Sequence, residues 1–266
     1  MRVIVFGSNG MLGTYLCKFL KKKYTIIPFT RKNIDISRAS KKEIFDFFES
    51  NIFEGDIIIN ASVITSRSEY EISDMITVNS LFPNYLSKLK QKIKCNVIHI
   101  TTDSVFNGLK GGYNENDPHD CLDEYGKSKS LGENNLITVI RTSIIGEEIR
   151  NKKSLVEWVK SQYGKEIFGY ENHLWNGLTC LELSKYIDTI ISTNNFWLGV
   201  KHIFSPDIVS KFELISMINE IYELKISIIK KETNQICFRN LSTIYESPIK
   251  KSIHSQITEL KKFNLI

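Results

Sequence analysis

MRVIVFGSNGMLG, residues 1–13, is the stretch that decides the fold of this chain of 266 residues. Val3–Phe6 is a compact apolar run with the length of a buried strand, and a glycine follows it directly. From Met11 to Lys22, apolar side chains recur at the spacing of an α-helix. The stretch therefore predicts a strand, a tight turn and a helix, which is the first unit of a parallel α/β sheet.

The loop between this strand and this helix carries three glycines. Gly7 allows a tight turn, Gly10 lets the backbone approach a ligand closely, and Gly13 lets the helix pack near the sheet. The helix N-terminus then presents free N–H groups and a partial positive charge to an anion such as a diphosphate. The loop predicts a dinucleotide site, although its glycines are spaced GxxGxxG instead of GxGxxG. The loop residues expected to contact the cofactor are Gly7, Asn9, Gly10, Met11, Leu12 and Gly13.

The alternation of strand and helix continues through the first half of the chain. Apolar runs indicate strands at residues 24–29, 57–59, 96–100 and 137–140, and helical spacing indicates helices at 41–49, from beyond 59 to about 91, and at 124–134. Runs that are apolar throughout are typical of parallel strands buried on both faces. The sequence therefore predicts an α/β fold with a doubly wound, parallel, Rossmann-type sheet.

Beyond residue 146 the regularity weakens. We expect helices at 153–161, 180–193 and 210–222 and a strand at 199–204, whereas residues 226–266 show no clean alternation. The expected organisation is a dinucleotide-binding domain of residues 1–145, to which about 180–208 return, and a smaller C-terminal substrate-binding lobe of residues 146–179 and 209–266. The longest irregular stretch, residues 106–122, is long enough to suggest a functional loop.

Composition excludes several classes of protein. Apolar residues at 42% and charged residues at 24% are typical of a globular chain and exclude a disordered or fibrous one. No run of about 18 uncharged apolar residues predicts a membrane span, and the N-terminal run fits a strand better than a signal peptide. The net charge of +5 is spread thinly, which favours a solvated surface over a nucleic-acid face. An odd count of five scattered cysteines predicts no disulfide framework and no metal site, and favours a reducing cytoplasm.

The end of the second strand reads Phe29-Thr30-Arg31-Lys32, with no carboxylate before Asp35. In a dinucleotide site an acidic residue at this place bonds the ribose 2′-OH of NAD, whereas an arginine accommodates the 2′-phosphate of NADP. A hydroxyl and two cations therefore favour NADP(H) over NAD(H), with Arg31 and Lys32 as cofactor contacts. The alternative is a solvated loop with ordinary charges.

Tyr125 and Lys129 lie four residues apart, which on a helix puts both side chains on one face. A phenol has a pKa of about 10 in water, and a neighbouring ammonium lowers it. A tyrosine so placed can donate a proton to a developing alkoxide or remove one from an alcohol. No other tyrosine of the chain has a lysine four residues on. Thr101 and Thr102 follow the strand at 96–100, at the sheet edge where ligands bind, so a threonine there can bond the same substrate oxygen.

Taken together, these residues resemble the extended short-chain dehydrogenase/reductases, and most closely the dTDP-4-dehydrorhamnose reductase group. The segment Trp175–Thr179 is similar to a weaker form of the group's substrate-side loop, and the C-terminal third matches poorly. The other matching segments occur in family order over about the first 145 residues: Gly7–Gly13, Asp35-Ile36, Asn60-Ala61-Ser62, Val78-Asn79, Thr101–Gly108, Tyr125–Lys129 with Gly132-Glu133, and Ile140–Ser143.

The resemblance implies NADPH-dependent reduction of the 4-keto group of a nucleotide-linked 4-keto-6-deoxy sugar, in deoxysugar or surface polysaccharide biosynthesis. It implies that Tyr125 donates the proton, that Lys129 tunes Tyr125 and holds the nicotinamide ribose, and that Thr102 orients the keto oxygen. It also places Asp35, Ile36, Asn60, Ala61, Ser62 and Asn79 at the cofactor, and Asp103, Ser104, Trp175 and Asn176 at the substrate.

Some residues depart from the group's pattern. Ser104 stands where related dehydratases carry the glutamate that assists water elimination, and Asp103 where related epimerase-reductases carry a cysteine, so neither reaction is favoured. The reductase group itself usually has tyrosine at the position of Ser104 and aspartate at that of Asn107, which leaves the sugar open. Two alternatives remain: a cofactor-binding regulatory subunit without turnover, and another reaction of the same fold, such as nucleotide-sugar epimerisation or alcohol oxidation. The expected partner is a nucleotide sugar, with no nucleic acid and no membrane, and a homodimer is left open.

Four other residues have a structural interpretation as well as a functional one. His99, inside an apolar run, is expected to be a core histidine, and His119 a solvated loop residue instead of a substrate contact. Trp175 either lines the sugar pocket or packs between the lobes. Arg141 either supports the site or only pairs with a carboxylate.

Overall fold

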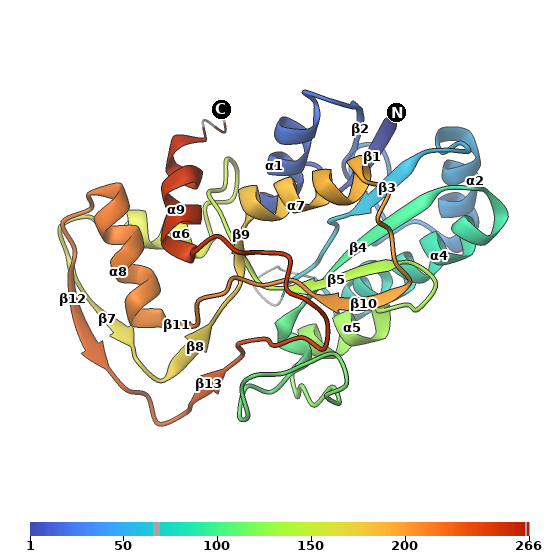
Figure 1. Ribbon diagram of the computed structural model, residues 1–266. Helices are drawn as coiled ribbons and strands as arrows, with labels where there is room; N and C mark the ends of the chain where they lie inside the picture. Colours follow the sequence, from blue (N-terminus) through green and yellow to red (C-terminus); the bar gives the residue numbers. More distant parts are fainter. Residues whose placement is uncertain (66–69, 264, 266) are drawn as a thin grey trace.

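The computed structural model describes residues 1–65, 70–263 and 265. Its centre is a six-stranded sheet in the order β10-β5-β4-β3-β1-β2, and every neighbouring pair of strands in it is parallel (Figure 1). This confirms the predicted α/β fold with a doubly wound parallel sheet. The six strands are β1 (Arg2–Phe6), β2 (Thr25–Phe29), β3 (Ile57–Asn60), β4 (Asn96–Thr102), β5 (Thr138–Thr142) and β10 (Gly199–His202).

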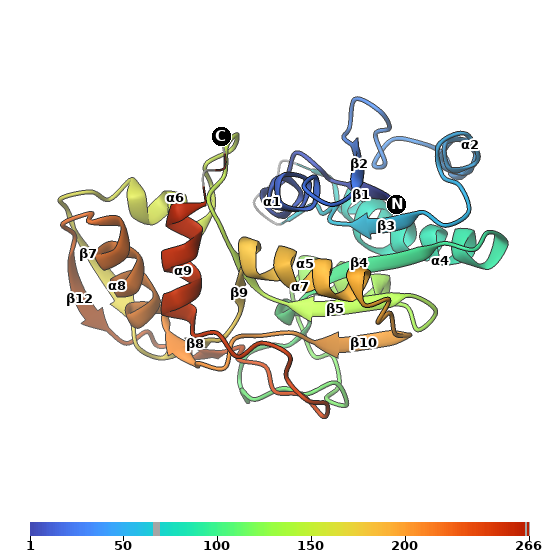
Figure 2. The same cartoon turned by 45° about the horizontal axis from the view of Figure 1, so that its top comes forward.

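Alternate side chains of each strand enter apolar clusters on opposite faces of the sheet. In β1, Val3 and Val5 belong to one cluster, and Ile4 and Phe6 to the other. Because both faces are buried, residues 3–6 include no polar side chain, which is why the run is apolar throughout. Helices α1 (Met11–Leu20) and α7 (Cys180–Ser192) cover the first face; α2 (Lys41–Asn51), α4 (Phe82–Lys92) and α5 (Glu124–Gly132) cover the second (Figures 1 and 2).

Helix α4 is reached through two short segments. The helix α3 (Ile72–Ile76) runs through one π-helical stretch, Thr77–Leu81, directly into α4. A π-helical turn widens the helix by one residue and often marks a functional site. Here it carries Val78-Asn79, one of the segments on which the family resemblance rests.

A smaller group of elements lies beside the sheet, at the left of Figures 1 and 2. Its strands form a parallel pair, β7 with β12, and a three-stranded sheet in the order β11-β8-β13. A further parallel pair, β6 with β9, follows β5 and precedes α7. The elements are β6 (Ile144–Ile145), α6 (Leu155–Lys160), β7 (Glu166–Tyr170), β8 (His173–Trp175), β9 (Leu178–Thr179), β11 (Val209–Ser210), α8 (Lys211–Tyr222), β12 (Ser227–Lys231), β13 (Cys237–Phe238) and α9 (Ile253–Lys262).

The ends predicted from periodicity for helices and strands lie within two residues of those in the structure. The region where the sequence showed no clean alternation, residues 226–266, nevertheless contains β12, β13 and α9. Before it, the strands β6, β7, β8, β9 and β11 were also missed. All of these elements belong to the smaller group.

Helix α7 packs against α1, and β10 pairs with β5 at the edge of the central sheet. The chain therefore returns to the sheet after its first excursion into the smaller group. This supports the expected division into residues 1–145 with 180–208, and 146–179 with 209–266, which we keep as a proposal. Over the described ranges, none of the helices combines the length and the apolar character needed to cross a membrane.

Candidate active site

The glycine loop forms an open cradle at the carboxyl end of β1. Gly7 has a φ of +75°, and a Cβ there would lie 2.8 Å from backbone atoms of Ala61. A Cβ at Gly13 would lie 2.1 Å from the carbonyl oxygen of Gly7, so only glycine fits. Helix α1 begins at Met11 with Gly10 as N-cap; no side chain caps its first turn, and no acidic residue lies in it. The N–H groups of this turn therefore remain available to an anion, and the cradle fits a diphosphate.

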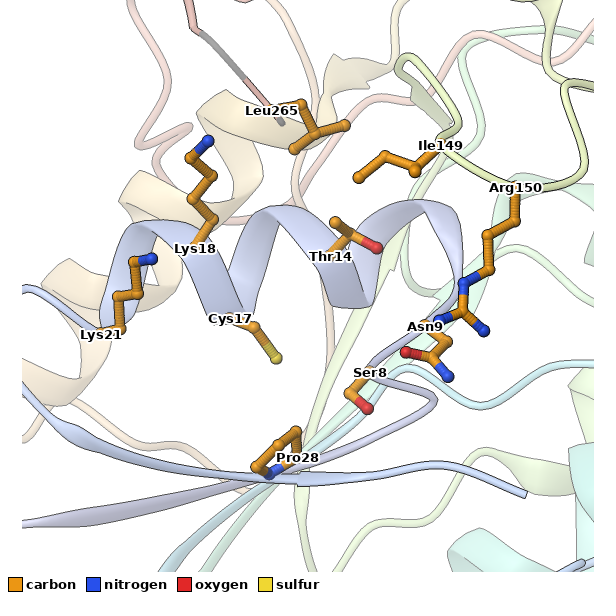
Figure 3. A pocket seen from close by; sticks show the side chains of 10 residues that line it. All are labelled: Ser8, Asn9, Thr14, Cys17, Lys18, Lys21, Pro28, Ile149, Arg150 and Leu265. Atoms are coloured by element: carbon orange, nitrogen blue, oxygen red, sulfur yellow. The ribbon is translucent and has the colours of Figure 1, made fainter. Parts of the chain in front are cut away.

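A cavity of about 430 Å³ adjoins this loop on the α1 side (Figure 3). Asn9, at the exposed tip of the loop, lines it together with the cations Lys18, Lys21 and Arg150. Figure 3 shows the Arg150 side chain reaching toward Asn9. Leu12, by contrast, is buried in the apolar cluster under α1. The cavity contains none of the three predicted catalytic residues, so it adjoins the cradle without reaching the reaction centre.

Two cations follow β2, and the nearby carboxylate is already engaged. Arg31 and Lys32 are exposed, and the Arg31 guanidinium lies 4.8 Å from the ring centre of Tyr70. Asp35 Oδ1 accepts hydrogen bonds from the backbone N–H and the hydroxyl of Ser37, at 3.1 and 2.7 Å. Its neighbour in the expected cofactor set, Ile36, is buried in the apolar cluster.

Asn60 is buried at the end of β3, and its amide is used inside the protein. Its Oδ1 accepts from the backbone N–H of Ser62 at 3.1 Å, and its Nδ2 lies 3.1 Å from Nδ1 of His99. Since His99 is fully buried and bonded to Asn60, the structure supports its interpretation as a core histidine. Asn60 thus shapes the turn that brings Ala61 and Ser62 against the glycine loop.

Asn79 is also buried and lies in the π-helical stretch. Its side chain bonds both backbone groups of Ile64, at 3.0 and 2.8 Å, and the hydroxyl of Ser128 at 3.0 Å. The amide therefore ties the loop after β3 to helix α5. Asn79 therefore positions these two elements at the site, and both polar atoms of its amide already have hydrogen-bond partners within the protein.

Helix α5 brings a tyrosine to the threonine that ends β4. The helix starts after Asp123, whose carboxylate accepts the N–H of Gly126 at 2.8 Å. A Cβ at Gly126 would lie 2.3 Å from the carbonyl oxygen of Ser104, so the missing side chain lets the helix lie against the turn after β4. The Tyr125 phenol therefore lies beside the Thr102 side chain, which lowers the pKa of the phenol.

Lys129 lies one turn further along α5 and is buried. Its Nζ donates a hydrogen bond to the carbonyl oxygen of Ile100 in β4, at 2.8 Å, and burial lowers the pKa of Lys129 to about 8. Burial raises the pKa of the Tyr125 phenol to about 12. In the free protein the ammonium bonds a strand carbonyl, and the expectation that it lowers the phenol pKa stays a prediction.

Asp103 and Ser104 follow Thr102 in a short 3₁₀ turn. Burial raises the pKa of the Asp103 carboxyl, against the opposing effects of the Arg239 guanidinium and of hydrogen bonds from Thr102, Ser143 and Ser104. Arg239 also donates from Nη1 to Ser104 Oγ at 3.2 Å. Sequence reasoning missed Arg239 because no motif surrounds it; only the pairing of β13 with β8 brings it to this turn.

The two residues expected on the substrate side after β7 have structural contacts. Asn176 is buried, and its amide donates to the carbonyl oxygen and accepts from the N–H of Leu241, both at 2.8 Å. Its polar atoms hold the C-terminal segment and are not free for a sugar. A Cβ at Gly177 would lie 2.3 Å from the Trp175 ring, which packs against the large apolar cluster that spans both parts of the molecule. These contacts support the interface alternative for Trp175.

Arg141 is the centre of a buried polar network behind α5. Its guanidinium bonds the Glu133 carboxylate at 2.5 and 3.0 Å, and it contacts Nε2 of both His119 and His202, at 2.6 and 2.7 Å. The interpretation of Arg141 as the partner of a carboxylate is supported. His119 is exposed in the loop before α5, which agrees with its interpretation as a solvated loop residue, and its ring also contacts Arg141 and Ser130.

The site therefore gathers at one edge of the central sheet. Thr102, Tyr125 and Lys129 lie at the carboxyl end of β4, the glycine cradle lies at that of β1, and β3 runs between these two strands. A phenol whose pKa is raised stays protonated near neutral pH and can donate its proton to an oxygen bound beside Thr102. Among the residues that the structure describes, no group of three histidine, cysteine or acidic side chains could hold a metal ion.

Comparison with known proteins gives a family for most of the chain. The family described as RmlD substrate binding domain matches residues 1–165. The dTDP-4-dehydrorhamnose reductase of Aggregatibacter actinomycetemcomitans is 35% identical over 149 residues, 54% of this chain and 49% of that protein. The spore coat polysaccharide biosynthesis protein SpsK of Bacillus subtilis (strain 168) is 36% identical over 153 residues, 53% of this chain and 52% of that protein. The chain thus spans about half the length of the curated relatives it matches.

Among solved structures, the chain is similar to the dTDP-4-dehydrorhamnose reductase (rfbD) from Bacillus anthracis str. Ames in complex with NADP. The TM-score is 0.82, the match covers 99% of both chains, and the sequence identity is 21%. At that identity the likeness shows a shared fold. It extends over the C-terminal part, where the family match has ended.

Proposed function

The chain belongs to the RmlD substrate binding domain family, and we propose that it reduces the 4-keto group of a nucleotide-linked 4-keto-6-deoxy sugar with NADPH. One observation carries the proposal: Tyr125, Thr102 and Lys129 lie together at the same sheet edge as an uncapped glycine cradle. The names of two relatives, a dTDP-4-dehydrorhamnose reductase and a spore coat polysaccharide biosynthesis protein, support this reaction and a place in polysaccharide biosynthesis.

The proposed cofactor is NADP(H). The N–H groups at the start of α1 suit its diphosphate, and Arg31 and Lys32 suit its 2′-phosphate. Asp35, the carboxylate that could accept the ribose hydroxyl of NAD, is engaged by Ser37. The Bacillus anthracis structure to which the chain is similar contains NADP. When bound here, the reduced nicotinamide supplies the hydride for the carbonyl carbon.

Tyr125 is the proposed proton donor. With a pKa raised to about 12, its hydroxyl is protonated at the pH of a cytoplasm, which suits a group that gives a proton to a newly formed alkoxide. The Thr102 hydroxyl, which lies beside Tyr125, orients the keto oxygen next to that proton. The same high pKa makes the phenol a poor base, so the free site is better suited to reduction than to alcohol oxidation.

Lys129 is proposed to hold the nicotinamide ribose. The Lys129 ammonium has three N–H groups, and it donates one of them to the carbonyl oxygen of Ile100. The remaining donors suit the ribose hydroxyls of a cofactor whose diphosphate lies in the cradle. The nucleotide of the substrate would bind toward the smaller lobe, so that remote contacts orient the sugar for transfer.

The test is turnover by the Tyr125→Phe variant. NADPH oxidation at 340 nm is followed with 4-keto-6-deoxy sugars linked to dTDP, UDP, GDP and CDP, and the product is identified by mass. We expect Tyr125→Phe to lower kcat at least about 100-fold, because a positioned proton donor contributes roughly 10²–10⁴-fold. Its NADPH affinity should remain unchanged. Tyr163→Phe, at an exposed tyrosine, serves as the matched control and should keep full activity.

Three outcomes would contradict the proposal. A Tyr125→Phe variant as fast as the parent would remove Tyr125 from the mechanism. Net product without net NADPH loss would indicate epimerisation. A chain that binds NADPH but consumes none with any of the four substrates, and copurifies with a synthetase, would be a regulatory subunit. A thermal-shift series with the four nucleoside diphosphates plus NADPH identifies the nucleotide, since ligands of the native state raise its apparent stability.

A further inference from the structure

Arg239 follows β13, and its backbone is held on both sides. Its N–H donates to the carbonyl oxygen of Leu174 in β8 at 3.2 Å. Two residues later, Leu241 is bonded through both backbone groups to the Asn176 amide. In Figure 1 this orange-to-red segment runs beside the green loop that follows β4, and Phe238 N–H donates to Gly108 O in that loop at 2.6 Å. Arg239 therefore has a defined position between the two parts of the molecule.

The Arg239 side chain extends from the smaller lobe onto the turn after β4. Its Nη1 donates to Ser104 Oγ at 3.2 Å, and that hydroxyl lies 3.4 Å from Asp103 Oδ1. The side chain passes over Gly108, where a Cβ would lie 3.2 Å from its Cγ. Its Nε is buried and has no hydrogen-bond partner among the described residues. A half-buried arginine whose Nε–H is buried and lacks such a partner, held on the turn beside the reacting groups, calls for an explanation beyond packing.

The charges around Tyr125 come from three elements. Asp103 after β4 and Asp123 at the start of α5 raise the pKa of the phenol, because two carboxylates disfavour a phenolate. Burial is the largest cause of the raised pKa; the contact with Thr102 lowers it, and Arg239 lowers it to a smaller extent. Lys129, on the same helix, bonds the β4 backbone. The cation that favours the phenolate in this site thus belongs to the other lobe.

We propose that Arg239 is a charge-positioning residue of this site: its guanidinium, held on the turn after β4 by Ser104, stabilises the phenolate that Tyr125 becomes when it gives up its proton. The inference rests on the proposed function. In that step the Tyr125 O–H bond breaks and an O–H bond forms on the carbonyl oxygen, whose carbon receives the hydride supplied by NADPH. The negative charge stays on the phenolate until solvent returns a proton.

In this arrangement Ser104 holds the Arg239 guanidinium in place. Its short hydroxyl accepts the hydrogen bond from Arg239 Nη1. The substrate lobe then contributes charge to the reaction, in addition to binding the nucleotide. Because Arg239 acts through Tyr125, removing its charge should slow the chemical step more than it weakens substrate binding.

The direct test is the titration of the phenol at position 125. A fluorinated tyrosine, whose hydroxyl is more acidic, is incorporated there by amber suppression, and its ¹⁹F resonance is followed against pH in the full-length chain. The variants are Arg239→Gln, which can still donate to Ser104 but carries no charge, and Arg239→Lys, which keeps the charge. Lys231→Gln removes one charge from β12 in the same lobe as the matched control.

We expect the midpoint to rise by about one pH unit in Arg239→Gln, to stay near the parental value in Arg239→Lys, and to be unchanged in Lys231→Gln. With active substrate, kcat of Arg239→Gln should fall by at most about tenfold, because the proton is only partly transferred in the transition state, while KM changes little. An unchanged midpoint in a folded Arg239→Gln variant overturns the inference. If the midpoint rises but no nucleotide sugar is reduced by the parent, the charge assignment stands and the proposed function fails.

Discussion

Acid should destabilise this protein through His202, which ends β10 and is almost completely buried. Nε2 of His202 lies 2.7 Å from Nη1 of Arg141. A guanidinium only donates, so this nitrogen must accept and carries no proton. The ring proton then sits on Nδ1, which donates to the carbonyl oxygen of Ser242 at 2.7 Å. A second proton would place an imidazolium against a guanidinium. Burial, and then Arg141, lower the pKa of His202 to about 4, although the Glu115 and Glu133 carboxylates oppose this.

The sign and size of the effect follow from linkage. In the unfolded chain a histidine has a pKa of about 6.5. Because the folded value is lower, the unfolded chain takes up the proton first as the pH falls, and the free energy of unfolding decreases. The loss begins near pH 6.5 and ends near pH 4, the folded pKa. Between pH 7.5 and 4.5 it amounts to about 2.5 kcal/mol, a large part of the roughly 5–15 kcal/mol that stabilises a typical domain.

Urea unfolding at pH 7.5, 6.5, 5.5 and 4.5 measures this loss when the parent is compared with His202→Gln. The glutamine Oε1 can accept from Arg141 but does not titrate. His119, whose pKa is also lowered by burial, and the carboxylates titrate in both proteins and cancel in the difference. We expect the parent to lose about 2.5 kcal/mol more than the variant over this range. A difference below about 1 kcal/mol would refute the assignment of the ring as a neutral acceptor.

Three further predictions concern the cradle, the C-terminal segment and the cofactor. Gly13→Ala forces a Cβ to within 2.1 Å of Gly7 O, so it should lower the melting temperature and weaken NADPH binding far more than Gly10→Ala, whose nearest contact is 3.2 Å; equal effects would argue against the close packing. Asn176→Ala leaves both backbone groups of Leu241 without their partner, and should cost about 2–4 kcal/mol in urea unfolding; a loss under about 1 kcal/mol would mean that the segment is held elsewhere. Arg31→Ala should raise the Kd for NADPH about tenfold and leave that for NADH unchanged in fluorescence titrations, whereas equal changes would remove Arg31 from the 2′-phosphate.

Local patterns were sufficient for the parallel sheet and the glycine loop. A strand such as Val3–Phe6 is apolar at every position because both faces of the sheet are covered, and this property is visible in four consecutive residues. The positive φ of Gly7 and the approach of Gly13 to the same turn are also short-range features. The Tyr125–Lys129 spacing, read on a helix, gave the right face of α5 for the same reason.

The C-terminal part lacked such signals, because its elements depend on distant partners. β12 is mostly exposed and pairs with β7, about sixty residues earlier, so its sequence shows no alternation. In α9 the buried stripe is interrupted by Gln256, which is buried because its amide bonds Thr179 N–H and Lys251 O. Ser252, the N-cap of α9, was the signal that could have revealed this helix.

Two residues that were predicted to contact ligands have buried amides with partners inside the protein. Asn79 and Asn176 stand at the places where the family resemblance predicts ligand contacts, yet both bond backbone groups of other segments, 15 and 65 residues away. A polar residue at the rim of a site can bind a ligand or shape the loop that does so, and the residue type is the same in both cases. Only the three-dimensional partner distinguishes the two uses, and for Asn176 that partner is the segment that carries Arg239.

The spacing of Tyr125 and Lys129 predicted their common face but not the acceptor of the ammonium. In the free protein that acceptor is Ile100 O in β4. With the ammonium held there, the phenol keeps a raised pKa and its proton, which favours the direction in which a carbonyl is reduced. Charge that favours the phenolate comes from Arg239, and Arg239 reaches the site only when the smaller lobe is packed against the turn after β4. Proton transfer and lobe packing are therefore coupled through one side chain.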